Sequence, residues 1–247
     1  MDTDKTLAII PARYASTRFP GKPLVEIQGR SMIRRVYEQA MKAELIDEVI
    51  VATDDERILQ HVQDFGGQAR MTSDQHRSGT DRCAEVAAAN PGFDRIVNIQ
   101  GDEPFIAPRQ IDQVVRPLME LEHVAISTLA KRLTDPSALF DPNVVKVVFD
   151  ATQKALYFSR STIPYLRDVP REEWLASADF YKHIGIYGFR REVLLAIAQL
   201  SPGLLERNES LEQLRWLEAG YAIHVGITQW ETIGIDRPED LSKVENG

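Results

Sequence analysis

The chain has 247 residues, 43% of them hydrophobic, and a formal net charge of -8 at pH 7. This length suffices for one large domain or two small ones around an ordinary core. The acidic balance argues against a nucleic-acid binder, which presents a basic face to the phosphate backbone. The single cysteine, Cys83, permits no internal disulfide and fits a reducing compartment. We expect a cytoplasmic protein without a membrane span, because there is neither a signal-peptide pattern nor a sufficiently long apolar run.

Short apolar runs alternate with helical patterns in the first half of the chain. Strands are expected at TLAIIPA, EVIVATD, QARMTS and RIVNIQ, and helices at residues 31–43, 56–65, 79–90 and 109–121. This alternation is typical of βαβ units. It predicts a largely parallel sheet with helices on both faces.

The alternation ends after residue 133. The stretch VVKVVFDATQKALYFSRS predicts two strands joined into a hairpin at residues 150–154, followed by a Pro-rich and charged excursion through residue 175. The strands HIGIYGF and AIHVGIT then enclose helices at 191–200 and 210–219, and a short helix starts at Pro238. Without a repeat or a clear linker, we predict a single α/β domain over residues 1–247 with an inserted β-rich lobe at about 130–190.

A cationic loop follows the first strand. The segment IPARYASTRFPGKPL carries Arg13, Arg18 and Lys22, and no acidic residue lies between Lys5 and Glu26. Guanidinium and ammonium groups at the carboxyl end of a strand can bind several phosphate oxygens. The loop matches neither the dinucleotide nor the P-loop glycine pattern. From its charge alone, phosphate binding and a solvated loop are equally good interpretations.

Two carboxylates follow strands elsewhere in the chain. Asp102 comes after a buried strand in VNIQGDEP, and Asp236 ends a strand in ETIGIDRPED. Mg²⁺ usually takes one or two protein carboxylates together with substrate phosphates, so the pair predicts a magnesium site facing the cationic loop. The alternative for Asp236 is an N-cap of the helix that begins at Pro238.

The motifs together resemble those of the 3-deoxy-manno-octulosonate (Kdo) cytidylyltransferases, the CMP-Kdo synthetases. The resemblance covers about residues 7–244 and runs through IPARYASTRFPGKPL, VATDDERI, HRSGTDR, VNIQGDEP, NVVKVV, ALYFSR, HIGIYGF, LEQLRWLEAG and GIDRPEDL. It implies a Rossmann-like, glycosyltransferase-A-like nucleotidyltransferase that is Mg²⁺-dependent and dimeric. The implied reaction joins CTP and Kdo to give CMP-Kdo and diphosphate for the lipopolysaccharide core, with the β-rich lobe serving sugar binding and dimerisation.

The resemblance also assigns roles to individual residues. Arg13 and Lys22 would hold the triphosphate, and Asp102 and Asp236 the metal; these four form the implied catalytic set. The implied nucleotide-binding residues are completed by Ser78, Gly79, Thr80, Arg82 and Gln100. The implied sugar-acid ligands are Gln100, Arg160, His183, Tyr187, Glu212 and Gln213.

Without the resemblance, the sugar-acid candidates have ordinary structural interpretations. His183 and Tyr187 are four apart and share a face of a strand, where a packed His and Tyr would be the commoner case. A surface ion pair is the usual role of a residue such as Arg160. Glu212 and Gln213 lie in a helical pattern whose polar positions normally face solvent. Ser78 and Thr80 would similarly be N-capping residues of the next helix.

Other functions stay open beside this reading. The alternatives are a cytidylyltransferase for another sugar acid, 8-amino-Kdo or sialic acid, and a non-catalytic regulator that binds CTP. A dehydrogenase is disfavoured because the Gly-rich fingerprint is missing. In the expected mechanism the anomeric hydroxyl attacks the α-phosphate in line, and no general base can be named.

Overall fold

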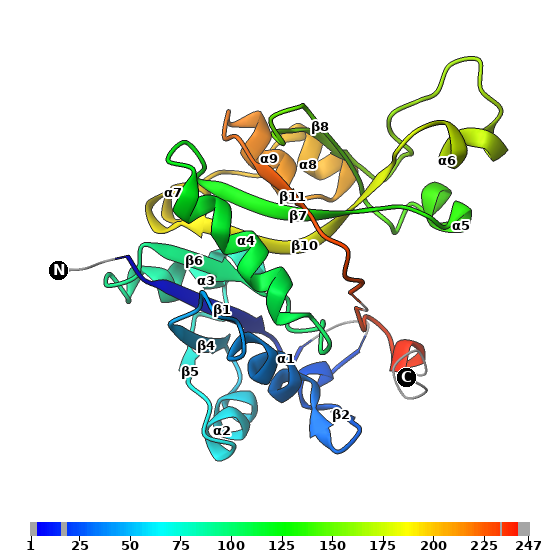
Figure 1. Cartoon of the computed structure of the whole chain (residues 1–247). Coiled ribbons are helices and arrows are strands. Elements are labelled where there is room, and N and C mark those ends of the chain that lie inside the picture. Colours follow the sequence, from blue (N-terminus) through cyan, green and yellow to red (C-terminus); the bar gives the residue numbers. More distant parts are fainter. Residues whose placement is uncertain (1–3, 16–18, 233, 242–247) are drawn as a thin grey trace.

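The computed structural model describes residues 4–15, 19–232 and 234–241, and a nine-stranded sheet runs through these ranges (Figure 1). Its strands are β1 (Thr6–Ala12), β4 (Glu48–Thr53), β5 (Ala69–Met71), β6 (Arg95–Asn98), β7 (Ile126–Arg132), β8 (Lys146–Phe149), β9 (Ala155–Ser159), β10 (Tyr181–Arg190) and β11 (His224–Ile227). The order is β11-β7-β10-β6-β1-β4-β5, and the β8–β9 hairpin attaches to β10. Only β10 runs antiparallel to its neighbours β6 and β7 along this path, so the expected mainly parallel sheet is confirmed.

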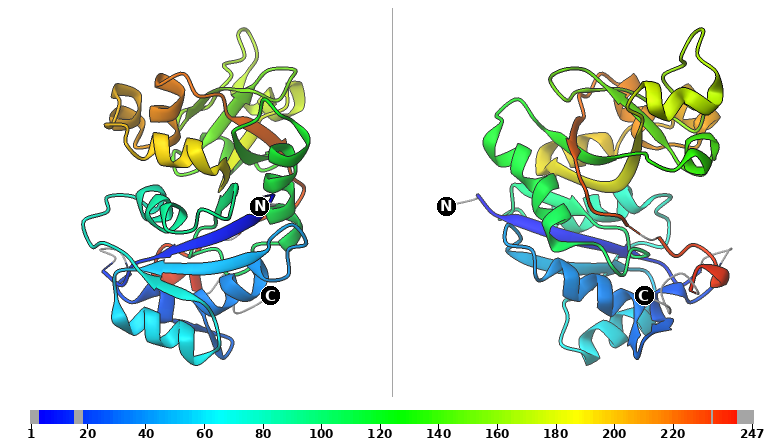
Figure 2. Two further views of the ribbon diagram at one scale, coloured as in Figure 1. Left: turned by 90° about the vertical axis from the view of Figure 1, so that its left-hand side faces the viewer. Right: turned by 45° about the vertical axis from the view of Figure 1, so that its right-hand side comes forward.

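Helices cover both faces of the sheet. They are α1 (Met32–Ala40), α2 (Glu56–Asp64), α3 (Gly79–Ala88), α4 (Pro108–Glu120), α5 (Pro136–Phe140), α6 (Trp174–Ser177), α7 (Arg191–Ile197), α8 (Leu204–Glu209) and α9 (Gln213–Glu218). Shorter elements are the hairpin β2 (Glu26–Ile27) and β3 (Arg30–Ser31) and the 3-10 turns η1 (Lys22–Leu24), η2 (Arg171–Glu173) and η3 (Pro238–Leu241). Figure 2 shows blue α1 and cyan α2 on one side of β1 and teal α3 on the other.

The sheet has a hydrophobic core on each face, and side chains of β1 pack into both of them. Leu7 and Ile9 pack into the core under α3, α7 and α9, whereas Ala8 and Ile10 pack into the core under α1, α2 and α4. All four side chains are fully buried. A strand covered on both faces reads as a continuous apolar run, which explains the opening pattern of the sequence.

One edge of the sheet gathers the segments that carry the candidate residues. The parallel strands β1, β4 and β6 end there, and antiparallel β10 begins there, because Tyr187 pairs with Asn98 at the end of β6. The described residues after β11 cross to the same region, where Ile235 packs with Ile27 of β2 (Figure 1). This convergence is the arrangement in which open α/β sheets bind ligands.

A bulge in β10 sets the direction of two side chains. His183 pairs with Ala130 and Tyr187 with Thr128, so four steps on β10 match two steps on β7. The Thr128 hydroxyl lies 3.2 Å from the Ile184 carbonyl and 2.8 Å from the Ile186 carbonyl inside the bulge. Because the extra length is an even number of residues, His183 and Tyr187 stay on one face.

Several short elements differ from the sequence expectations. The expected helix at 210–219 is confined to α9, and α8, α5, α6 and the β2–β3 hairpin were not predicted. In the excursion, Trp174 and Phe180 stack and pack with Leu133 and Leu139 into a small separate core. Such short helices depend on this contact rather than on periodicity. The single-domain organisation and the limits of the lobe stay predictions, although β8, β9 and β10 within those limits belong to the nine-stranded sheet.

The expectations about a membrane span and about Cys83 can be compared with the described residues. No helix in the described ranges is long and apolar enough to cross a membrane. Cys83 is buried on α3 and is a free thiol, and burial raises its pKa.

Candidate active site

Lys22 lies between the two carboxylates that the sequence singled out. Its Nζ is 2.8 Å from Asp102 Oδ2 and 3.4 Å from Asp236 Oδ1. The Lys22 side chain is 15% exposed, against 28% for Asp102 and 52% for Asp236, so the group opens towards solvent on its carboxylate side. The structure thus brings residues 22, 102 and 236 together from three distant segments.

The segment after β11 is fastened at several points before it reaches Asp236. The Glu231 carboxylate is 2.7 Å from Lys131 Nζ and also pairs with Lys182. The Ile235 side chain is fully buried, and its N–H donates to the Asp102 carbonyl at 3.0 Å. These contacts fix the carboxylate of Asp236 opposite that of Asp102.

At the start of η3, a different aspartate accepts the backbone N–H groups. Asp240 Oδ2 accepts from the N–H of Asp236 at 3.0 Å and from that of Arg237 at 2.9 Å. The Asp236 carboxylate faces Lys22 instead. The carboxylate of Asp236 thus takes part in an ion pair, and its interpretation as an N-cap of η3 stays a prediction.

The two acids after β6 have different environments. Asp102 faces the open side, whereas Glu103 is buried and its Oε2 has no hydrogen-bond partner among the described residues. Burial, and then the neighbouring Asp102 carboxylate, raise the pKa of Glu103 to about 8. At neutral pH, Asp102 is thus the better hard-oxygen ligand of the two.

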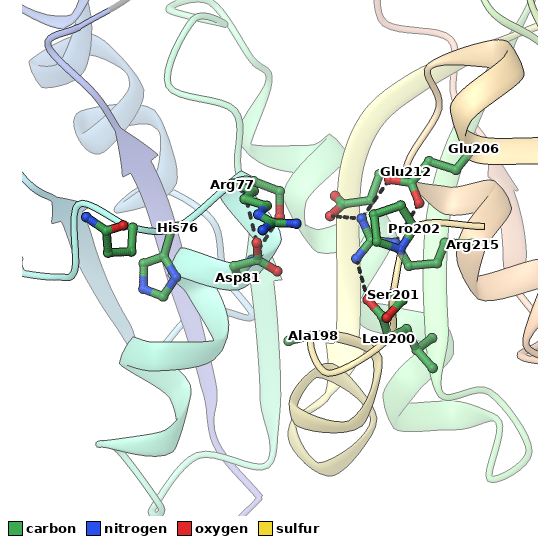
Figure 3. A pocket seen from close by; sticks show the side chains of 12 residues that line it. His76, Arg77, Asp81, Ala198, Leu200, Ser201, Pro202, Glu206, Glu212 and Arg215 are labelled. Atoms are coloured by element: carbon green, nitrogen blue, oxygen red, sulfur yellow. Dashed lines mark hydrogen bonds and ion pairs between the residues drawn. The ribbon is translucent and has the colours of Figure 1, made fainter. Parts of the chain in front are cut away.

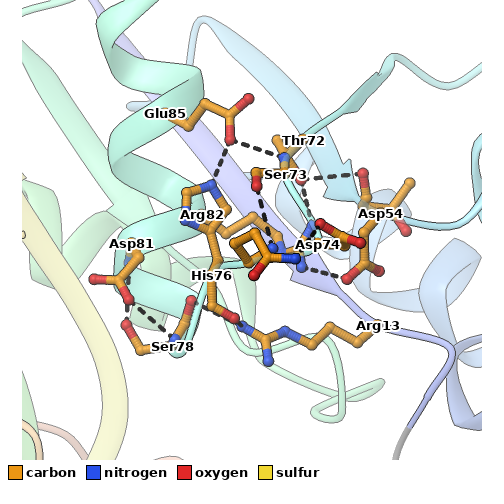
Figure 4. Close-up of polar contacts among 12 residues, drawn as sticks. Arg13, Asp54, Thr72, Ser73, Asp74, His76, Ser78, Asp81, Arg82 and Glu85 are labelled. Atoms are coloured by element: carbon orange, nitrogen blue, oxygen red, sulfur yellow. Dashed lines mark hydrogen bonds and ion pairs between the residues drawn. The ribbon is translucent and has the colours of Figure 1, made fainter.

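Arg13 reaches the loop of the HRSGTDR motif (Figure 4). Its Nη2 donates to the carbonyl of His76 and, at 3.4 Å, to that of Ser78. Carbonyls leave the guanidinium charge without a carboxylate partner in these two contacts, which suits an anionic ligand. Arg18, the third cation of the opening loop, lies outside the described residues.

Arg82 is fully buried and occupied by protein partners. Its Nη2 donates to Asp54 Oδ2 at 2.7 Å, and its Nη1 donates to the Thr72 hydroxyl. Figure 4 shows this pair on the side of α3 that faces β4 and β5. The ion pair ties α3 to the ends of these strands, and the nucleotide contact implied by the resemblance remains a prediction.

The beginning of α3 combines capping with close packing. Ser78 Oγ accepts from the Asp81 N–H and Asp81 Oδ2 accepts from the Ser78 N–H, both at 3.1 Å, so the capping interpretation is confirmed for Ser78. A Cβ at Gly79 would lie only 3.1 Å from Pro11 Cγ. Thr80 does not cap in this way, because its hydroxyl donates to Glu212 Oε2 at 2.6 Å.

A pocket of about 450 Å³ opens between the α3 loop and the segment from α7 to α9 (Figure 3). Arg215 on its wall donates to both oxygens of Glu206, at 2.7 and 2.6 Å, and its Nη2 is 3.7 Å from Glu212 Oε1. Burial raises the pKa of Glu212. The pocket therefore has a fixed, charged wall next to the implied nucleotide and sugar residues.

His183 and Tyr187 contact each other, with ring centroids 5.4 Å apart. His183 Nε2 lies 3.0 Å from the Thr128 hydroxyl, and burial lowers the pKa of the imidazole to about 3. Burial, and then Glu212, raise the pKa of Tyr187. His183 is therefore a neutral hydrogen-bonding group at physiological pH rather than a cation.

Unpartnered polar atoms gather around Tyr187. Its ring meets that of Trp216 edge-on at 5.0 Å, and its backbone pairs with Asn98. Within the described residues, Tyr187 Oη, Asn98 Oδ1 and Trp216 Nε1 are buried without hydrogen-bond partners. Such groups usually bind water or ligand. The sequence reasoning gave no role to Asn98 or Trp216, although Asn98 stands inside the quoted motif VNIQGDEP.

The remaining sugar-acid candidates lie at different depths. Arg160 belongs to a separate network, in which its guanidinium contacts carbonyls of residues 142, 209 and 210. Gln213 is buried rather than solvent-facing. Gln100 lies beside β10, since a Cβ at Gly185 would be 3.9 Å from Gln100 Cγ. The predicted residues thus form three groups, around Lys22, around Thr80 with Tyr187, and around Arg160.

Comparison with known proteins agrees with this architecture. A family model described as cytidylyltransferase matches residues 7–229. The chain is 57% identical over 244 residues to the 3-deoxy-manno-octulosonate cytidylyltransferase of Parabacteroides distasonis, covering 97% of this chain and 96% of the relative. Identity is 53% over 240 residues to the protein of that name from Cytophaga hutchinsonii, with 96% and 95% covered.

Solved structures extend the comparison. One described as CMP:2-keto-3-deoxy-manno-octonic acid synthetase complexed with CTP matches with a TM-score of 0.91 at 43% identity, covering 98% of both chains. The 4-diphosphocytidyl-2C-methyl-D-erythritol synthase of Anaerococcus prevotii shares only the fold, with a TM-score of 0.64 at 17% identity over 99% of this chain and 96% of that one. The fold and the site define a nucleotidyltransferase of the cytidylyltransferase family. Within that family, the chain belongs to the 3-deoxy-manno-octulosonate cytidylyltransferases, and the resemblance found in the sequence is confirmed.

Proposed function

We propose that this protein transfers CMP from CTP to the anomeric hydroxyl of Kdo, giving CMP-Kdo and diphosphate. The names of its relatives support the sugar acid, and the CTP named with the similar solved structure supports the nucleotide. The single observation that carries the proposal is the position of Lys22 Nζ between Asp102 and Asp236 at the ligand-binding edge. A cation and two acids are what a polyphosphate and its metal require.

The reaction depends on Mg²⁺, and the residues present fit that ion. Two carboxylates approach one ammonium, both are hard oxygen donors, and both are partly exposed. Asp102 and Asp236 would hold the ion. When bound, it supplies charge neutralisation for the phosphate oxygens and lowers the pKa of a coordinated hydroxyl.

The chain's own cations act on the leaving group. The hydroxyl oxygen forms a bond to the α-phosphorus and its proton passes to solvent water, while the bond from that phosphorus to the bridging oxygen breaks in line and diphosphate leaves. Lys22 and Arg13 stabilise the charge that develops on the diphosphate. Arg160 binds the carboxylate of the sugar acid. The neutral imidazole of His183, together with Tyr187 and Glu212, holds its hydroxyl groups.

The setting of the enzyme follows from the same family membership. We propose that it works as a homodimer in the cytoplasm and that its product feeds the lipopolysaccharide core. Exposed Phe140, Tyr165 and Leu156 in the β-rich lobe supply apolar surface for the dimer contact.

The experiment is diphosphate release from purified protein with CTP and Mg²⁺, run with Kdo, 8-amino-Kdo, sialic acid and no acid. We expect release only with Kdo. Release with another acid keeps the nucleotide site and replaces the sugar. CTP binding without release under any condition would contradict catalysis and favour a CTP-binding regulator.

A further inference from the structure

Lys146, on β8, is a fully buried lysine. Its Nζ donates to the carbonyl oxygens of Asp141 at 2.9 Å, Val144 at 2.5 Å and Arg160 at 2.8 Å. Three acceptors match the three N–H groups of an ammonium. A buried charge held by carbonyls rather than by a carboxylate is costly to keep, so its position calls for an explanation.

The three carbonyls belong to two segments. One is a loop that contacts the Arg160 side chain, and the other contains Arg160 itself. Asp141 and Val144 lie in the loop between α5 and β8, and Arg160 directly follows β9. Within that loop, the Pro142 carbonyl accepts from Arg160 Nη1 at 3.1 Å. Lys146 therefore holds both the backbone of Arg160 and the loop whose carbonyl orients the guanidinium.

The other contacts of Arg160 leave its charge available. Its Nε donates to the Glu209 carbonyl at 2.6 Å and its Nη2 to the Ser210 carbonyl at 3.3 Å. The Glu209 carboxylate is used differently, because it accepts from the Arg160 backbone N–H at 2.9 Å and from the Ser159 hydroxyl at 2.6 Å. Among the described residues, three of the five guanidinium N–H groups are thus used on neutral acceptors, and two remain for an anion.

We propose that Lys146 is a positioning residue for recognition of the sugar-acid carboxylate, acting through Arg160. Its three hydrogen bonds hold the 141–144 loop against the end of β9, and this arrangement fixes the direction of the Arg160 guanidinium. This inference rests on the proposed function, which places Arg160 on that carboxylate. A guanidinium that is already oriented loses less conformational freedom on binding than a mobile one. Loss of Lys146 should therefore weaken binding of the sugar acid rather than binding of CTP.

The test is steady-state kinetics of Lys146→Met, which keeps the apolar stem and removes the donors. We expect KM for Kdo to rise about tenfold or more and KM for CTP to change less than about twofold. The matched control is Val147→Ala, a buried neighbour on β8 that packs in the core. It weakens the same strand without removing a donor to Arg160. If Lys146→Met does not fold, Lys146→Gln, which keeps an amide donor, takes its place.

Arg160→Lys and the double variant separate the possible outcomes. If Lys146 acts through Arg160, the double variant raises KM for Kdo no further than Arg160→Lys alone. The inference would be overturned if the KM increases of the two single variants multiplied in the double variant, or if Val147→Ala raised KM for Kdo as much as Lys146→Met. Either result would leave Arg160 at the sugar acid. An unchanged KM in Arg160→Lys would overturn it as well. Failure of the proposed function is seen separately, as absence of Kdo-dependent diphosphate release from the unaltered protein.

Discussion

The Thr80 hydroxyl donates to Glu212 Oε2 at 2.6 Å and so joins the first turn of α3 to the residue that precedes α9. The motifs HRSGTDR and LEQLRWLEAG, proposed to bind the nucleotide and the sugar acid, thereby share a partly buried hydrogen bond. Burial raises the pKa of Glu212, and its bond to Thr80 is the largest influence in the opposite direction. The first turn of α3 and the start of α9 are therefore linked by a hydrogen bond that also affects the pKa of Glu212.

Thr80→Val removes this link while keeping the shape of the side chain. We expect a loss of about 1–3 kcal/mol in the free energy of unfolding, because a buried carboxylate oxygen loses its donor. The control is Thr152→Val, whose hydroxyl donates to Asp150 at 2.6 Å in an exposed turn. Urea unfolding of both variants measures the difference. Equal, small losses would show that burial does not strengthen the Thr80 bond.

Asp102→Asn tests the assigned acid. Turnover should fall by about 10² or more with little change in stability, because the amide keeps the shape and removes the charge facing Lys22. Asp112→Asn is the control, since its carboxylate accepts from the Leu45 N–H on a distant part of the fold. Diphosphate release is measured for each. Near-normal turnover in Asp102→Asn would contradict the metal assignment.

Removal of divalent ions tests the same pair by another route. EDTA should abolish diphosphate release, and added Mg²⁺ should restore it. Mg²⁺ should also raise the Tm of the unaltered protein through binding to the native state, and this rise should vanish in Asp236→Asn. Release that persists in EDTA, or a Tm rise that survives in the variant, would remove Mg²⁺ from residues 102 and 236.

His183 predicts a pH dependence of stability. Its pKa falls from the ordinary 6.5 to about 3 in the folded protein. Between these values the unfolded chain binds the proton and the folded chain does not, so the free energy of unfolding decreases as pH falls below 6.5. His183→Gln should remove up to about 1.4 kcal/mol per pH unit of this slope. Equal slopes for both proteins between pH 4 and 6 would contradict a buried, neutral imidazole.

Arg82→Met separates a structural role from ligand binding. It leaves the Asp54 carboxylate without its 2.7 Å partner, and we expect a destabilisation of about 3–5 kcal/mol. Arg57→Met is the matched control, because that arginine pairs with Asp55 at 2.6 Å on the surface and should cost less than about 1 kcal/mol. Thermal unfolding compares them. A stable Arg82→Met protein that has only lost CTP affinity would place Arg82 directly on the nucleotide.

The sequence could predict the sheet, Lys22 and Asp102 for a common reason, whereas the strand expected to end at Asp236 is absent from the described residues, since β11 ends at Ile227. Residues that follow parallel strands meet at one edge, so the positions of Asp102 and the cationic loop follow from local pattern. The burial of Arg82 could not be read in this way, because it depends on how α3 packs against the ends of β4 and β5, where Asp54 and Thr72 accept its N–H groups. The same holds for the bulge in β10, which depends on Thr128 of β7.

The group of Lys146 and Arg160 shows a second limit. A lysine between valines in NVVKVV reads as an exposed position of a strand, but its ammonium donates to two carbonyls of the preceding loop and to the carbonyl of Arg160 after the next strand. Tyr187, Asn98 and Trp216 gather only through β-sheet register and packing of α9. Periodicity describes one element at a time, whereas these residues acquire their partners from elements that are paired in space.

The position of Asp236 also bears on when the enzyme becomes active during its synthesis. Asp102 and Lys22 are synthesised early, whereas Asp236 comes after the last strand, next to Ile235, which packs against Ile27 and Met32. A nascent chain that has already folded its sheet still lacks one of its two carboxylates. A chain that stops before residue 236 therefore lacks the second acid beside Lys22, even when every strand through β11 is present.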